Sequence, residues 1–227
     1  MTATSAITEA VAWTARAAGL PWPLEALGPT PLDRCINALR LTHDEVTPLT
    51  RRHASDYLRR CGVLRAELAS DETPLAGFLF ATPSAGAILV RSDDTLPRRR
   101  FSAAHELGHY VLHFLPLLRT SAQAILATDD ERIDEQPPDL PAEPEESPGA
   151  AADERARREQ EANRFAAELL MPEVVCQRLC QAYQVRFGAA AHASARFLEH
   201  HLATDLLVSR EAIRVRLQTL RLVPLPS

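Results

Sequence analysis

The sequence predicts an α+β fold that is mostly helical, with a small antiparallel sheet of about three strands beside one central helix. Two observations carry this prediction. Apolar residues recur at helical spacing through most of the chain, and two short apolar runs, residues 77–80 and 87–90, stand close together between turn-forming residues. The 227 residues, of which 46% are hydrophobic and 24% charged, are enough to build one substantial core.

The first part of the chain is expected to form a helical region packed on the domain that follows. A short helix is predicted over residues 7–18, and two or three more over residues 33–68, because apolar side chains recur there every three or four positions. Pro74 breaks this pattern, and the two apolar runs after it predict a strand hairpin. We therefore divide the chain into an N-terminal helical region, 1–70, and a main domain, 71–227.

The central helix is predicted to begin at Pro97, with Thr95 as a candidate cap, and to end near Pro116. A second long helix is predicted over residues 153–171, where Pro172 stops it. A helical C-terminal subregion, 173–227, is expected to contain helices over residues 173–184 and 189–203 and a last helix capped by Ser209.

Residues 128–152 differ in composition from the rest of the chain. They contain five prolines and nine acidic residues against the single base Arg132, and they offer few apolar side chains to bury. Such a composition predicts a poorly ordered, acidic insertion between the two long helices.

Composition also argues against several classes of protein. The formal net charge of −5 argues against a dedicated nucleic-acid-binding protein. No apolar run approaches the length of about 18 residues that a membrane-spanning helix needs. Four cysteines are too few for a disulfide scaffold in a chain of this length, and no secretory signal is recognisable, so we expect reduced thiols and a cytoplasmic protein.

The sequence His105-Glu106-Leu107-Gly108-His109 lies inside the central helix and carries the strongest chemical signal. Residues four apart project from one face of a helix, so both imidazoles can approach one zinc ion at about 2.0–2.1 Å. Glu106 points about 100° away around the helix and can act as the base that takes a proton from water. The small Gly108 leaves room for another element to pack closely.

The third metal ligand has two candidates. His113 continues the spacing, but on an unbroken helix it lies about 12 Å along the axis from His105, too far for bonds near 2 Å. We therefore expect His113 to be a neighbouring residue rather than a ligand. Glu159, on the second long helix, can complete a His/His/Glu set and leave one position open for water. Asn163, one turn further on, can hydrogen-bond a ligand imidazole and fix its tautomer.

Sequence reasoning leaves the group that would stabilise the oxyanion of the reaction open. Tyr110, Tyr183, His113 and the nearby arginines are candidates, and spacing does not rank them. Cys176 and Cys180 also stand four apart on a helix, but such cysteines are more often small buried hydrophobic residues.

Three blocks of sequence resemble the ImmA/IrrE family of metallopeptidases. They are RFSAAHELGH at residues 100–109 with Leu112-His113 after it, E-x-x-A-N-x-F-A-A-x-L-L-M-P at residues 159–172, and V-S-R-E-A-x-x-x-R-L at residues 208–217. Their order along the chain is also that of the family, and the resemblance runs from about residue 77 to about residue 222.

The resemblance implies a gluzincin-like fold, zinc held by His105, His109 and Glu159, and Glu106 as the catalytic base; manganese is an alternative metal. It further implies a protein substrate, a helix-turn-helix transcriptional repressor of the XRE type, whose cleavage regulates transcription of stress-response or mobile-element genes. The acidic insertion at residues 128–152 departs from the family pattern.

Two other classes of function compete with this interpretation. A DNA-binding transcriptional regulator would use the triplet Arg98-Arg99-Arg100 and the arginines of the last helix. A non-catalytic interaction module would use a structural metal. Closed structural sites have four protein ligands, commonly cysteines, whereas this chain offers three ligands and an adjacent glutamate.

Overall fold

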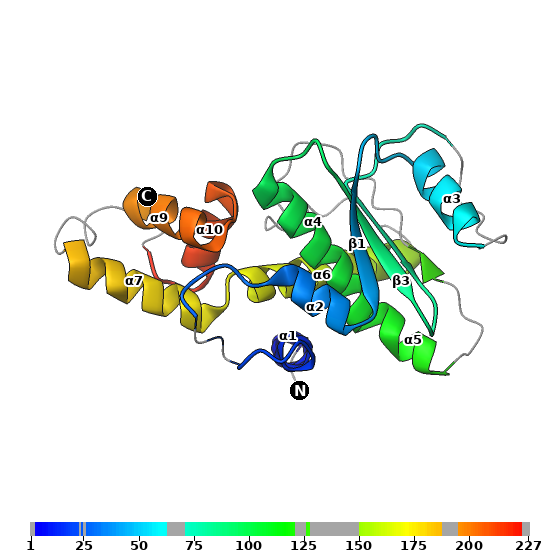
Figure 1. Cartoon of the computed structure of the whole chain (residues 1–227). Helices are drawn as coiled ribbons and strands as arrows, with labels where there is room; N and C mark the ends of the chain where they lie inside the picture. The colour runs from blue at the N-terminus through cyan, green and yellow to red at the C-terminus, as the bar shows by residue number, and fades with distance from the viewer. Residues whose placement is uncertain are drawn as a thin grey trace.

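The computed structural model describes residues 3–22, 24, 26–62, 71–120, 126–127, 150–187 and 195–223. Figure 1 shows the arrangement of its elements. The helices are α1 (Ala3–Ala17), α2 (Leu32–Ala38), α3 (Arg51–Arg60), α4 (Leu96–His109), α5 (Leu115–Thr120), α6 (Ala150–Leu170), α7 (Glu173–Phe187), α9 (Ala195–Leu206) and α10 (Arg210–Thr219). The strands are β1 (Leu41–Val46), β2 (Gly77–Ala81), β3 (Gly86–Arg91) and β4 (Leu126–Ala127). The predicted class, a mostly helical α+β fold, is confirmed.

The sheet has the order β1-β3-β2-β4. β2 and β3 form the predicted antiparallel hairpin, with Leu79 opposite Ile88. The sheet as a whole is mixed rather than antiparallel, because β1 pairs with β3 in parallel. β1 lies inside the region predicted to be helical. Its buried and exposed residues do not alternate cleanly, and pairing with β3 decides its conformation, which no local pattern shows.

The two faces of the sheet are covered by different helices, as Figure 1 shows for α4 and α3. Successive side chains of a strand point to opposite faces. One face joins the main core and packs against α4; its strand residues are Leu41, Leu79, Ala81, Ile88 and Val90. The other face forms a smaller cluster with α3 and its neighbours; its members are Leu49, Ala54, Leu58, Leu75, Phe78, Phe80 and Leu89.

The main core extends from Ile7 in α1 to Val223 after α10. Helices α1 and α2 therefore pack on the same core as α4, α6 and the C-terminal helices, whereas α3 belongs to the smaller cluster. The division predicted near residue 70 stays a prediction, and residues 63–70 lie outside the described part of the chain.

The central helix does not end near Pro116 as predicted. After α4, residues Tyr110–Phe114 form one π-helical turn, in which the Leu115 N–H donates to the Tyr110 carbonyl, and α5 continues the helix through Pro116. A proline ring in a regular helix clashes with the carbonyl four residues earlier. The wider π turn before Pro116 changes that register and lets the helix continue.

The boundaries predicted for the C-terminal helices agree better with the structure. α6 ends at Leu170, ahead of Pro172, and Ser209 caps α10 by accepting a hydrogen bond from the Ala212 N–H at 3.0 Å. Figure 1 shows α7, α9 and α10 grouped to one side of the sheet. Of the predicted insertion 128–152, only residues 150–152 are described, as the start of α6; residues 128–149 lie outside the described part.

No helix among the described residues is both long enough and apolar enough to cross a membrane.

Candidate metal centre

The site is built where α4 and α6 cross at close range. A Cβ atom at Gly108 would lie 3.1 Å from Phe165 Cδ1 and 3.2 Å from the Cα of Ala162, so a larger residue at position 108 would require these α6 atoms to shift. This confirms the expectation that glycine leaves space for a second element. The close crossing brings one face of α6, with Glu159 and Asn163, over the α4 face that carries His105 and His109.

Three donor atoms converge at this crossing. His105 Nε2 lies 2.9 Å from His109 Nε2. Oε2 of Glu159 lies 3.3 Å from His105 Nε2, and Oε1 of Glu159 lies 3.3 Å from His109 Nε2. Among the described residues, these three side chains form the one group of His, Cys, Asp or Glu that could hold a metal ion.

The donor set fits a tetrahedral metal. Ligand atoms bound at about 2.0–2.1 Å in tetrahedral geometry stand roughly 3.3 Å apart, close to the separations observed. His105 Nδ1 lies 2.9 Å from Asn163 Oδ1. An amide oxygen only accepts, so Nδ1 carries the hydrogen, and in the neutral ring Nε2 then presents its lone pair to the other two ligands. The Nε2 lone pair of His105 and the Glu159 carboxylate face the same point, together with Nε2 of His109, and a cation bound there would be attracted to all three groups.

Burial of the trio is uneven. His105 and His109 are 2% and 4% exposed, whereas the side chain of Glu159 is 30% exposed. The centre is therefore open to solvent on the α6 side. Partial burial by itself would raise the pKa of Glu159, but contacts with His105 and His109 outweigh it and hold this pKa well below its ordinary value. The carboxyl group is thus ionised at neutral pH, as a metal ligand must be.

Glu106 is fully buried beside the trio. It follows His105 on α4, so its side chain leaves the helix about 100° around the axis, toward the start of β2 rather than toward α6. Glu106 is therefore not one of the three converging donors.

His113 lies next to the trio without joining it. Its ring centroid is 5.6 Å from that of His109, and its Nε2 is 3.7 Å from Oε2 of Glu161 on α6. Burial, followed by the charge of His109, lowers the pKa of His113. Glu161 also accepts a hydrogen bond from Arg157 at 2.5 Å, so it belongs to a network on α6 that its place in the sequence did not reveal.

The two tyrosines named as oxyanion candidates belong to different parts of the structure. Tyr110 is 7% exposed within the main core, and burial raises its pKa. The hydroxyl of Tyr183 donates to Asp205 at 2.7 Å, and its ring stacks on His201 with centroids 4.9 Å apart. Both side chains therefore have structural contacts elsewhere.

The arginines of the basic triplet bind neighbouring parts of the chain. Arg98 pairs with Asp94 at 3.4 Å, Arg99 pairs with Glu45 at 3.2 Å, and Arg100 donates to the Thr30 carbonyl at 2.9 Å. In the last helix, Arg216 is turned inward and pairs with Glu168 of α6. These contacts do not build the exposed basic stripe that a DNA-binding surface needs.

The cysteines of the C-terminal helices are structural. Cys176 and Cys180 are buried, and burial raises the pKa of Cys176 to about 12 and that of Cys180 to about 11. The thiol of Cys176 donates to the Met171 carbonyl at 3.6 Å.

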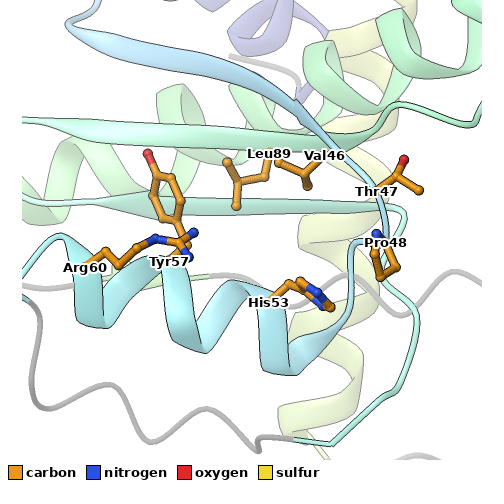
Figure 2. Close-up of a pocket in the computed structure, with 7 residues that line it drawn as sticks. All are labelled: Val46, Thr47, Pro48, His53, Tyr57, Arg60 and Leu89. Atoms are coloured by element: carbon orange, nitrogen blue, oxygen red, sulfur yellow. The ribbon is translucent and has the colours of Figure 1, made fainter.

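A hollow of about 340 Å³ lies on the opposite face of the sheet from α4, between β1 and α3. Figure 2 shows that His53, Tyr57 and Arg60 of α3 line one side of it, and that Leu89 and Val46 lie across from them. None of the predicted site residues lines this hollow.

The comparison with known families agrees with this placement of the chemistry. Residues 59–137 match the Peptidase_M78 family model, described as the IrrE N-terminal-like domain. The matched segment includes α4 with its two histidines and ends before α6, which carries Glu159 and Asn163. A search of curated proteins returns no match.

Proposed function

We propose that this chain, which belongs to the ImmA/IrrE family of metallopeptidases, is a zinc-dependent endopeptidase that cleaves one specific protein substrate. Zinc is held by His105, His109 and Glu159, and Glu106 is the general base. The observation that carries the proposal is the convergence of three donor atoms within 4.8 Å of one another, two of them from a helix that also carries the fully buried Glu106.

Each residue of the site has a distinct role in peptide hydrolysis. Bound zinc supplies Lewis acidity, which lowers the pKa of water toward about 7 and polarises a peptide carbonyl. Glu106 accepts the proton of the attacking water and then delivers a proton to the leaving amine. Asn163 holds the Nδ1–H of His105, so that Nε2 faces the centre. Manganese is an alternative metal for the same ligands.

The substrate is a helix-turn-helix repressor of the XRE type, and its cleavage releases the genes that it controls, including those of a stress response. This part of the proposal is supported by the three blocks that resemble the ImmA/IrrE family. The reaction takes place in the cytoplasm. Four cysteines without a disulfide support that location.

The test is incubation of the purified chain with XRE-type repressors encoded beside its own gene, followed by mass spectrometry. A single cut that a chelator abolishes and zinc restores is expected. Glu106→Gln should keep zinc, because its side chain is not a ligand, but should lose about 10²–10⁴-fold in rate. If no repressor is cut in the presence of zinc, the proposed substrate is wrong.

The Glu106→Gln variant also separates the proposal from its two competitors. A non-catalytic metal module would bind its partner equally well with Glu or Gln at position 106. A DNA-binding regulator would bind duplex DNA with a strong salt dependence, which the internal pairing of Arg98, Arg99 and Arg216 argues against.

A further inference from the structure

Position 77 begins β2, and its side chain would point at the general base. Gly77 lies opposite Val90 of β3, and directly opposed residues of an antiparallel pair share one face of the sheet. Val90 belongs to the core that packs against α4. Leu79 and Ala81, two and four residues after Gly77, face the same core.

The space on that face at position 77 is filled by Glu106. A Cβ atom built on Gly77 would stand 2.5 Å from Oε1 of Glu106, 3.1 Å from its Cγ and 3.2 Å from its Cδ. Real Cβ atoms essentially never come within 3.0 Å of a non-bonded heavy atom, so any other residue at 77 would force the carboxylate to move. Glycine is not required here by its backbone, because the φ of Gly77 is not in the left-handed region.

Gly108, in contrast, is small for the sake of helix packing, because its missing Cβ would meet Phe165 and Ala162 of α6. Gly77 has a different neighbour, a functional carboxylate with no exposed surface. A fully buried carboxylate can take few positions, and the strand that lies against it decides which one.

We infer that Gly77 is a positioning residue for the reaction: the missing side chain lets the Glu106 carboxylate lie against β2, where it faces the water that it deprotonates. The inference rests on the proposed function for the role of Glu106. A displacement of about 1 Å at a catalytic group can cost about 10²-fold in rate, so one methyl group at position 77 should slow catalysis without removing a metal ligand.

The experiment compares the wild type, Gly77→Ala, Glu106→Ala and the double variant. Gly28→Ala is the matched control, because a Cβ at Gly28 would meet no atom within 4 Å. Thermal unfolding of the metal-free proteins measures the contact itself. Overpacking of about 1–3 kcal/mol corresponds to a fall in Tm of several degrees in a chain of this size. We expect that fall for Gly77→Ala with Glu106 present, and no fall when residue 106 is alanine.

Catalysis and metal binding are measured on the same set. For Gly77→Ala we expect kcat to fall by about 10²-fold, with KM and zinc affinity within about twofold of wild type. Equal destabilisation by the Gly77→Ala substitution in both backgrounds, or a wild-type kcat in Gly77→Ala, would overturn the inference. Absence of cleavage by the wild type would instead contradict the proposed function, and the thermal comparison would still decide whether Gly77 positions Glu106.

Discussion

Two glutamates of α6 show how differently one helix can use a partly buried carboxylate. Glu168 meets Arg216 of α10, and the Nε of Arg216 also donates to the Met171 carbonyl at 2.9 Å. Glu159 meets the imidazoles of His105 and His109 at 3.3 Å. The Glu168 junction contains a permanent cation, whereas the Glu159 junction contains only rings that are neutral or charged according to pH.

This difference separates a structural contact from a binding site. Side chains at the Glu168–Arg216 junction are 16% and 12% exposed, and their charges balance without any other group. At the Glu159 junction, two imidazoles and a carboxylate converge; while the imidazoles are neutral they do not balance the negative charge of the carboxylate, and a metal ion bound there would. The partners of a partly buried carboxylate, rather than its burial, therefore indicate whether it is a metal ligand. Substitutions at the two junctions should separate loss of metal binding from loss of stability.

The largest effect is expected for Glu159→Gln, which removes one metal ligand. Zinc binding by four ligands is worth about 10–16 kcal/mol in small structural sites, so loss of one ligand should cost about 3–4 kcal/mol, or about 10²–10³-fold in affinity. Competition titration with a zinc chelator measures it. Glu168→Gln is the matched control and should leave zinc affinity unchanged; an equal loss in both variants would contradict the comparison.

Arg216→Met should lower the free energy of unfolding and leave zinc affinity unchanged. It leaves Glu168 buried without its cation, and breaking such a pair from one side costs about 3 kcal/mol in the free energy of unfolding. Urea unfolding of the metal-free protein measures that cost. Zinc affinity should stay at the wild-type value, because Arg216 contacts the end of α6 rather than its middle. A loss of zinc binding would show that the two junctions are coupled.

Asn163→Ala should have a smaller effect on the metal centre. The variant loses the acceptor for His105 Nδ1, and comparable losses around ligand histidines cost about 10–100-fold in metal affinity or activity. Asn163→Asp keeps an acceptor oxygen at the same place and should retain more affinity than alanine. If Asn163→Ala binds zinc as tightly as the wild type, the hydrogen bond between His105 Nδ1 and Asn163 does not orient His105 for metal binding.

The smallest effect concerns Cys176, whose thiol donates to the same Met171 carbonyl as Arg216. Burial raises the pKa of Cys176 to about 12 from an ordinary value of 9.0. Above pH 9 the unfolded chain therefore loses a proton that the folded chain keeps, and stability falls as pH rises, by at most about 1.4 kcal/mol per pH unit.

Urea unfolding at pH 8 and pH 10 should thus show a smaller alkaline loss for Cys176→Ala than for wild type. Cys61→Ala, which changes an exposed cysteine, should behave as wild type. An unchanged slope in Cys176→Ala would mean that this thiol ionises in the folded protein as it does in the unfolded chain.

Sequence patterns predicted those parts of the fold that depend on local rules. Pro172 ends a helix because its ring cannot be accommodated in the helix interior, and Ser209 caps the last helix through its own hydroxyl. The parts that were mispredicted depend on pairing with another strand or on a departure from regular helix geometry. β1 is a strand because it pairs with β3, and the helix after His109 continues past Pro116 because a π turn precedes it.

For the candidate site, sequence spacing alone placed His105 and His109 on one face of a helix, since residues four apart share a face in any regular helix. The same spacing argument separated Glu106 from them. Tertiary structure decided everything that involves a second element: the convergence of Glu159 with the two imidazoles, the contact between His113 and Glu161, and the pairing of Glu168 with Arg216. Tertiary structure also showed why position 77 is glycine: the carboxylate of Glu106 occupies the space that a side chain at this position would need.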